Sequence, residues 1–76
     1  MYTSTRSKNA IRIVIDIMRS HESTSVSAIA QRQELPVIYT RNLLIPLVKS
    51  SIVKKARGGF KLGKAKEFID IIRAVN

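Results

Sequence analysis

The sequence predicts a single domain with a mainly helical α+β fold, in which four helices accompany one small β-hairpin. The chain has 76 residues and is no longer than one ordinary domain. Hydrophobic residues make up 45% of it and recur with helical periodicity over most of its length. One stretch, residues 52–62, instead alternates apolar and basic residues around two adjacent glycines, which is typical of a hairpin.

The first helix is predicted over about residues 8–20, with Ser7 as its N-cap. Arg12, Asp16 and Arg19 are spaced by four and then three residues, so we expect a solvent-exposed stripe that contains an ion pair. Seven residues at helical spacing should form the apolar face: Ile11, Val14, Ile15 and Met18, widened by Ala10, Ile13 and Ile17.

Polar residues 21–25 end this helix, and a short second helix should follow. Ser25 is its expected N-cap, because a serine side chain can accept a hydrogen bond from a free backbone amide of the first turn. Val26, Ile29 and Ala30 should face inward, and the helix should end near Arg32. Residues 33–35 then form a short link.

The third helix should begin at Pro36, whose fixed φ and missing N–H suit a first turn, and run towards Lys49. Pro46 lies inside it and removes a backbone hydrogen bond. We therefore expect a kink near residues 42–45, or a helix in two pieces. With the second helix it forms a helix-turn-helix over about residues 26–49, and its apolar face comprises Leu43, Leu44, Leu47 and Val48.

The predicted hairpin over about residues 52–62 turns at Arg57, Gly58 and Gly59. A final helix is predicted over about residues 65–75. In this order the elements form a winged helix-turn-helix, which lays its third helix in the major groove of DNA and uses the hairpin as a wing. The apolar positions of the final helix are Phe68, Ile69, Ile72 and Val75.

The charge of the chain favours a polyanionic partner. Lys and Arg number 14 against 5 acidic residues, which gives a formal charge of +9. In so small a domain, nucleic acid is the expected source of the opposite charge, ahead of an acidic protein or an anionic membrane. Neither a secretory signal nor an apolar run of membrane-spanning length occurs in the sequence, so a cytoplasmic location is expected.

No catalytic residue, cofactor, metal site or small-molecule ligand is predicted, so we do not expect an enzyme. The absence of cysteine excludes disulfides, thiolate metal sites and a cysteine nucleophile. The single histidine, His21, lies in a polar link, and the acidic residues lack the spacing of paired catalytic carboxylates or of metal ligands.

Residues that could read bases lie in the first turns of the third helix: Ile38, Tyr39, Thr40, Arg41 and Asn42. Arg41 can bind guanine O6 and N7, Asn42 can bind adenine N6 and N7, and Ile38 can contact only a thymine methyl group. Tyr39 is equally well explained as a packing residue. The expected wing and phosphate contacts are Arg57, Lys55, Lys61, Lys54, Arg6 and Lys8, although Lys54 or Lys55 alone is also typical of a solvated strand edge.

Four blocks follow one another along nearly the whole chain: MYTSTRSKNAIRIVIDI, SVSAIAQRQELPVIYTRNLL, SIVKKARGGFKL and EFIDIIRAVN. Together they resemble the N-terminal DNA-binding domain of the Rrf2 family of bacterial transcriptional regulators. The resemblance implies sequence-specific binding to double-stranded DNA, usually as a homodimer on a partly palindromic site. It also suggests a bacterial or mobile-element source. By position it implies contacts from Ile38, Tyr39, Arg41, Asn42 and Arg57.

The sequence departs from the family pattern in several places. Family members generally continue into a long dimerisation helix, and many carry a cysteine cluster for an iron–sulfur centre. Since this sequence shows neither, the resemblance implies neither iron–sulfur sensing nor the usual dimer contact. The wing turn is shorter than is typical of the family, and Asn9 stands where an aromatic residue is common.

Two alternatives to DNA reading stay open. The domain could instead be a protein-binding module that captures an acidic partner or a full-length regulator, because Val37 and Ile38 are aliphatic residues on the expected reading face. RNA binding is a weaker alternative, because the few aromatic residues offer little stacking surface. If the chain forms a homodimer, Ile71 and Val75 of the last helix are the expected apolar contact. The sequence does not reveal the operator, the effector or the sign of regulation.

Overall fold

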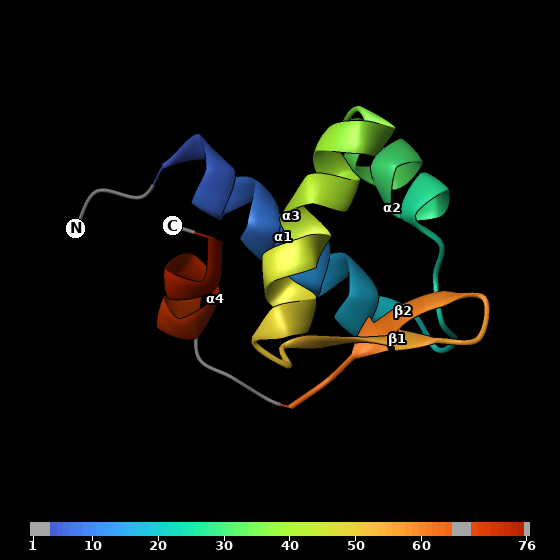
Figure 1. The fold of residues 1–76 in the computed structure, drawn as a ribbon. Helices are drawn as coiled ribbons and strands as arrows, with labels where there is room; N and C mark the ends of the chain where they lie inside the picture. Colours follow the sequence, from blue (N-terminus) through green and yellow to red (C-terminus); the bar gives the residue numbers. More distant parts are fainter. Residues whose placement is uncertain (1–3, 65–67, 76) are drawn as a thin grey trace.

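The computed structural model describes residues 4–64 and 68–75, with the backbone alone for residues 68 and 69. The elements follow the predicted order (Figure 1). The predicted start of the last helix at residue 65 and the inward side chains of Phe68 and Ile69 lie outside the described part. The observed elements are α1 (Thr5–Arg19), α2 (Val26–Gln33), α3 (Val37–Lys49), β1 (Val53–Ala56), β2 (Gly59–Leu62) and α4 (Phe68–Val75).

Helix α1 begins three residues earlier than predicted. Ser4 is its N-cap, and the Ser4 Oγ accepts a hydrogen bond of 3.1 Å from the backbone N–H of Ser7. The predicted cap, Ser7, lies fully buried inside the first turns of the helix. Both positions carry a serine. Ser4 is the one with the extended backbone conformation that an N-cap requires.

The face of α1 that enters the core is narrower than the predicted face of seven residues. Met18 is 57% exposed, and Ile11 and Ile15 are only half-buried. Apolar residues cover so much of this helix that two sets with the same helical spacing fit the pattern, and the periodicity alone cannot choose between them. The structure buries the set Ala10, Ile13, Val14 and Ile17.

One hydrophobic core joins α1, α2, α3 and α4 to the base of the hairpin, and Ile29 is the contribution of α2. Leu43, Leu44 and Leu47 of α3 are buried as predicted, and Val48 packs at the edge of the core. Ile52 and Val53 extend the core to β1, and Ile71 and Val75 extend it to α4. Within the described residues, no helix combines the length and the apolar character needed to cross a membrane.

The helix-turn-helix forms at the predicted position. Ser25 caps α2 as expected, since its Oγ accepts a 3.1 Å hydrogen bond from the N–H of Ala28. Glu34 adopts a left-handed conformation with φ 56° and so turns the chain into α3, where Pro36 is the N-cap and not the first helical residue. Helix α3 continues through Pro46, so a helix in two pieces is wrong. Pro46 lies near the C-terminal end, where its missing N–H removes only one hydrogen bond.

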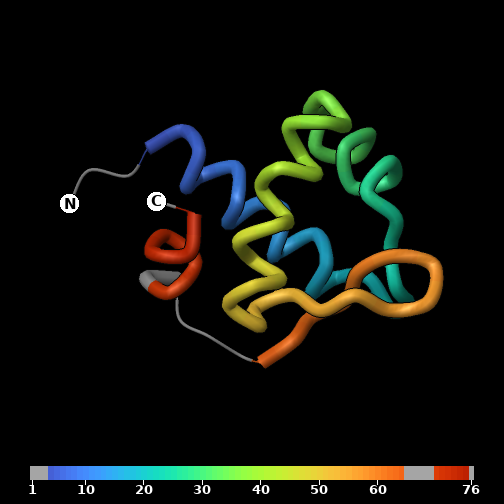
Figure 2. Tube along the Cα trace, viewed as in Figure 1, coloured from blue at the N-terminus to red at the C-terminus, as the bar shows by residue number. Residues whose placement is uncertain are grey.

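Strands β1 and β2 form the predicted antiparallel hairpin, with Ala56 opposite Gly59. The segment before α2 pairs with the free edge of β2, so that it runs beside the hairpin (Figure 2). Thr24 donates to the Phe60 carbonyl at 2.9 Å and accepts from the Phe60 N–H at 2.8 Å. Gly59 is needed here, because its φ is 152° and a Cβ atom would lie 2.2 Å from the carbonyl oxygen of Thr24.

Candidate nucleic-acid interface

The solvent face of α3 carries one continuous stripe of side chains. Ile38, Asn42, Ile45 and Lys49 are separated by four, three and four residues, so they lie in a line along the helix, and all four are exposed. The Ile38 side chain is 74% exposed and that of Ile45 is 49% exposed. Ile45 and Lys49 were not among the predicted contacts, although their spacing from Ile38 places them on its face.

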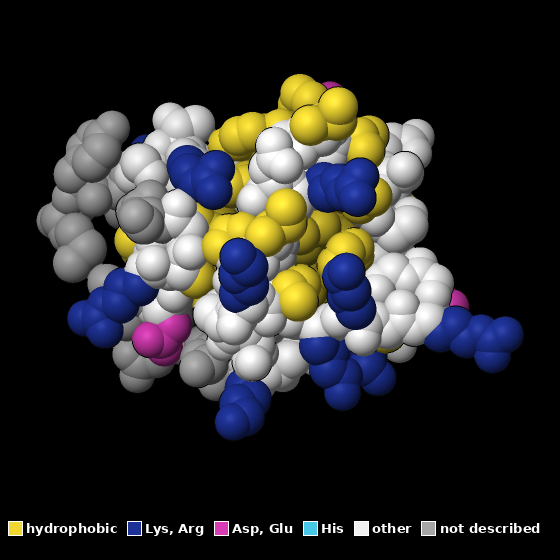
Figure 3. All heavy atoms as spheres, viewed as in Figure 1, with side chains coloured by type: hydrophobic (Ala, Val, Ile, Leu, Met, Phe, Trp, Pro, Cys, Tyr) yellow, Lys and Arg dark blue, Asp and Glu magenta, His cyan; other side chains and the backbone are white. Residues whose placement is uncertain are grey.

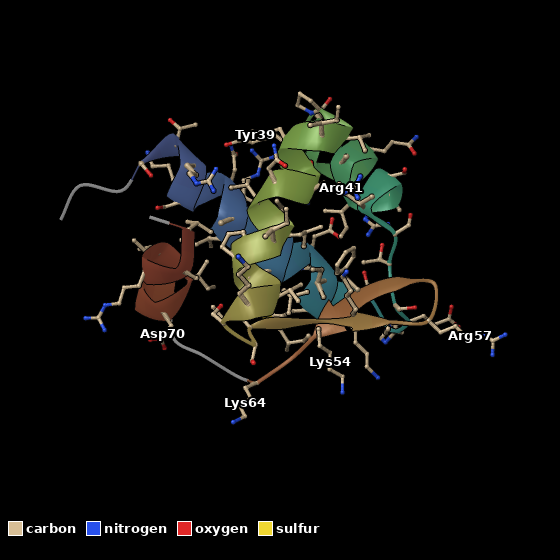
Figure 4. All side chains as sticks on the ribbon, viewed as in Figure 1. Tyr39, Arg41, Lys54, Arg57, Lys64 and Asp70 are labelled. Carbon is tan, nitrogen blue, oxygen red and sulfur yellow. The ribbon has the colours of Figure 1, made fainter. Side chains whose placement is uncertain are left out.

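Arg41 and Tyr39 lie on opposite flanks of this stripe (Figure 4). Arg41 is exposed on the flank that faces the hairpin. Tyr39 is half-buried on the α1 side, packs against the core, and its hydroxyl accepts a hydrogen bond of 3.1 Å from Asn9 Nδ2. The packing explanation of Tyr39 therefore has direct structural support.

Thr40, one of the predicted base contacts, does not face solvent. Its side chain is fully buried, and its hydroxyl donates a 2.9 Å hydrogen bond to the backbone carbonyl of Pro36. The reason is helical geometry, because Thr40 has the same spacing as the buried Leu43, Leu44 and Leu47 and so points into the core with them.

The two faces of the hairpin separate the predicted wing lysines. Because side chains alternate along a strand, Lys55 shares a face with the buried Val53 and with its cross-strand partner Phe60, on the side of α3. Lys54 and Lys61 lie directly opposite each other on the other face. Because the two lysines are cross-strand partners, their like charges repel each other. A nearby anion would reduce this repulsion. Lys54 points away from α3, and Arg57 projects from the tip of the hairpin (Figure 4).

A groove runs between α3 and the inner face of the hairpin. It encloses about 590 Å³, and its floor is formed by apolar side chains such as Leu44 and Phe60. Three cations line it, Arg41 and Lys49 from α3 and Lys55 from β1, and none of its described lining residues is acidic. Figure 3 shows this face, with Lys and Arg side chains around a hydrophobic centre and acidic side chains at the margins.

Arg6 and Lys8 do not belong to this groove. The Arg6 Nε donates a 2.8 Å hydrogen bond to the carbonyl oxygen of Val75, and so ties the first turn of α1 to the end of α4. Lys8 is exposed on the same helix. These ends of α1 and α4 lie across the molecule from the tip of the hairpin (Figure 1). A phosphate contact from either residue would therefore belong to a different part of the surface.

Asp16 is buried, which contradicts the predicted solvent-exposed stripe. Its carboxylate accepts hydrogen bonds from Arg32 Nη2 at 2.6 Å, Arg32 Nε at 3.0 Å and Gln33 Nε2 at 2.8 Å. Burial raises the pKa of Asp16, but these hydrogen bonds and the charge of Arg32 outweigh it, so the pKa is lowered from its usual value. The ion-pair partner is Arg32 of α2, and not Arg12 or Arg19 of the same helix.

The Asp16–Arg32 pair also reaches the hairpin. Arg32 Nη2 donates a second hydrogen bond, of 2.6 Å, to the Thr24 hydroxyl, and Thr24 is the residue that pairs with Phe60 of β2. Sequence reasoning missed this network, because 16 residues separate Asp16 from Arg32 and no local spacing indicates the contact. Through these contacts the network links α1, α2 and the hairpin.

The residues expected to form a dimer contact are not available for it. Ile71 and Val75 are 2% and 6% exposed, and both belong to the hydrophobic core. That choice was wrong because one face of α4 packs against α1 and α3, which leaves other residues of α4 at the surface.

Comparisons with known proteins support the fold. Residues 3–76 match the profile of a family described as Rrf2, iron-dependent transcriptional regulator. The HTH-type transcriptional regulator CymR of Bacillus subtilis (strain 168) is 34% identical over 83 residues, which cover 99% of this chain. A relative from Synechocystis is 33% identical over 76 residues, which cover 93% of this chain. The chain spans 52% and 60% of the lengths of the Synechocystis and B. subtilis relatives, respectively.

Two solved structures have the same fold as this chain. The structure of CymR (YrzC), the global cysteine regulator of B. subtilis, matches with a TM-score of 0.90 and 33% identity, over 99% of this chain and 64% of that one. IscR of T. potens matches with a TM-score of 0.90 and 27% identity, over 100% of this chain and 61% of that one. The predicted winged helix-turn-helix fold is confirmed.

The family description mentions iron, for which cysteine thiolates and histidine imidazoles are typical protein ligands. The sequence contains no cysteine and one histidine. Among residues 4–64 and 68–75, no three His, Asp or Glu side chains come together as a metal site would require. The residues that the structure describes therefore do not fit an iron centre.

Proposed function

This chain belongs to the Rrf2 family of transcriptional regulators, which are not enzymes, and we propose that it binds a double-stranded DNA operator in a sequence-specific manner. The match of residues 3–76 to the family profile confirms the resemblance that the sequence shows. The observation that supports the proposal most strongly is the shared face of α3 and the hairpin, where Arg41, Lys49 and Lys55 surround one groove. Such an arrangement suits double-stranded DNA, because the DNA phosphates flank a major groove that is wide enough for an α-helix.

In this proposal α3 enters the major groove with its exposed stripe towards the bases. Asn42 lies within that stripe, and Arg41 lies beside it on the hairpin side. Each of these side chains can form two hydrogen bonds to one base, Asn42 with adenine and Arg41 with guanine. Contacts of this kind select a sequence, whereas contacts to phosphates only position the protein.

The outer rim of the groove between α3 and the hairpin then lies against the sugar–phosphate strand that separates the major groove from the adjacent minor groove. Lys49 and Lys55 approach that strand from its two sides, and Arg57 at the tip of the hairpin reaches the minor groove. Lys54 and Lys61, on the outer face, contribute through their positive field to flanking phosphates.

We further propose that the chain binds a partly palindromic site as a homodimer. Its expected location is the cytoplasm. The dimer contact has to come from residues other than the buried Ile71 and Val75. Sedimentation of the chain at high concentration, with and without a two-half-site duplex, tests this part. A monomer under both conditions excludes the dimer.

A salt titration on duplex DNA tests the proposed binding face. We expect Arg41→Ala to relax the base preference of the chain for a duplex selected from a random pool. Lys55→Ala should weaken binding to all duplexes alike and lower the slope of log K against log salt by about one. Arg19→Ala is the matched control, because it removes an exposed cation from α1 outside the groove. If the control lowers the slope as much as Lys55→Ala does, the binding face has been misplaced.

The alternative of an acidic protein partner draws on the same face, because Val37, Ile38 and Ile45 are exposed apolar side chains among the cations. The titration separates the two hypotheses. An acidic-partner module would show no preference among duplexes, and Arg41→Ala would then weaken binding to every duplex equally.

A further inference from the structure

Two exposed isoleucines lie at the centre of the proposed reading face. Ile38 and Ile45 are 74% and 49% exposed, on the same stripe of α3, and they are seven residues apart. Two helical turns separate them, which corresponds to about 10.5 Å along the helix. Asn42 lies between them on the stripe.

We propose that α3 reads two thymine methyl groups about three base pairs apart, one through Ile38 and one through Ile45. This inference rests on the proposed function. The thymine methyl is the apolar group that base edges present in the major groove, so it is the complement of an exposed aliphatic side chain there. At about 3.4 Å per base pair, the separation of the two isoleucines corresponds to about three base pairs.

Asn42 adds a polar contact between the two methyl groups. Its side chain is exposed on the same stripe, four residues after Ile38 and three before Ile45. An asparagine can bind adenine through N6 and N7. The operator half-site should therefore place an adenine between two thymine methyl groups, on either strand.

Ile45 reaches the bases only if α3 lies lengthwise in the groove. The structure favours that arrangement, because the hairpin follows directly after α3 and carries its own cations. Lys49 at the end of α3 and Lys55 on the hairpin line the same groove as Arg41. Phosphate contacts at this end hold the second half of α3 against the duplex, whereas end-on insertion would use Ile38 alone.

Replacing thymine by uracil tests the inference, because it removes the methyl group and leaves base pairing intact. A duplex is selected from a random pool with the full chain, and each thymine of the selected sequence is then replaced by deoxyuridine in turn. We expect about fourfold weaker binding at each of two positions about three base pairs apart, which is the ratio for one buried methyl group. Ile38→Ala should abolish the sensitivity at one position, and Ile45→Ala at the other.

Met18→Ala is the matched control, since Met18 is a 57% exposed apolar residue on α1. It should leave both sensitivities intact. Thermal unfolding of each variant checks that the fold is kept. A selected duplex whose binding is insensitive to uracil, or sensitive only at the Ile38 position, overturns the two-methyl reading but leaves DNA binding in place. If no duplex is enriched from the pool, the proposed function fails, and this inference fails with it.

Discussion

Replacing Asp16 by Asn tests whether the buried ion pair holds the fold together. The substitution keeps the shape of the side chain but removes its charge. It also turns one hydrogen-bond acceptor into a donor that faces the N–H groups of Arg32 and Gln33. Hydrogen bonds to a charged group contribute about 1.5–3 kcal/mol each. The Arg32 side chain is 46% exposed, so water compensates part of the loss.

We therefore expect Asp16→Asn to lower the free energy of unfolding by about 2–3 kcal/mol, below the cost of breaking a fully buried pair. In a domain of this size, that corresponds to a fall in Tm of roughly 10–20 °C. Thermal and urea unfolding followed by circular dichroism at neutral pH measure both quantities. Glu22→Gln is the control, because it neutralises an exposed carboxylate on the loop after α1.

The pH dependence of the difference gives a second check. The pKa of Asp16 is lowered in the folded protein. Its contribution to stability is therefore fully present above the pKa of about 3.9 that Asp has in the unfolded chain, and it is lost as pH falls through the lowered folded value. The stabilities of the two proteins should converge at strongly acidic pH. Equal unfolding midpoints at neutral pH, or a difference that persists unchanged in acid, would refute the reasoning.

Three further substitutions test individual contacts, each by the same unfolding measurements. Gly59→Ala should destabilise the fold by more than about 2 kcal/mol, because its Cβ would lie 2.2 Å from the Thr24 carbonyl oxygen; wild-type stability would mean that the Thr24 pairing is not formed. Ser4→Ala removes the cap of α1 and should cost about 1 kcal/mol, and no loss would place the helix start elsewhere. Arg6→Ala should cost about 0.5–1.5 kcal/mol through the lost hydrogen bond to Val75, without changing the salt slope of DNA binding; a lower slope would show that Arg6 also contacts a phosphate.

The order of the elements could be predicted because each has a local signal. Ser25 caps α2 as expected, and the hairpin forms where the alternation surrounds two glycines. The burial of Thr40 also had a signal, since its spacing from Leu43, Leu44 and Leu47 is that of one helix face. Thr40 is next to Arg41 in the sequence, but the two side chains lie on different faces of α3.

The remaining features depend on contacts that no local pattern encodes. Apolar residues on α1 fit two core faces equally well, and only the packing of α3 and α4 selects Ala10 and Ile13 over Ile11 and Ile15. The Asp16–Arg32 pair joins two helices, so local spacing suggested a partner on the same helix instead. Alternation along the strand already puts Lys54 and Lys55 on different faces of the hairpin, but the position of Lys54 opposite Lys61 depends on the register of the two strands.

The position of the hairpin relative to α3 also depends on residues outside the proposed DNA-binding face. An isolated two-stranded hairpin is at best marginally stable in water, so the wing needs support from the rest of the molecule. Its outer edge is paired with Thr24, the Thr24 hydroxyl is bonded by Arg32, and Arg32 is held by the buried Asp16. This chain of contacts adds to the core packing of Val53 in holding the hairpin beside α3, and so supports the shape of the groove between them. Asp16 therefore supports the proposed DNA-binding face, although its own side chain is buried and does not belong to that face.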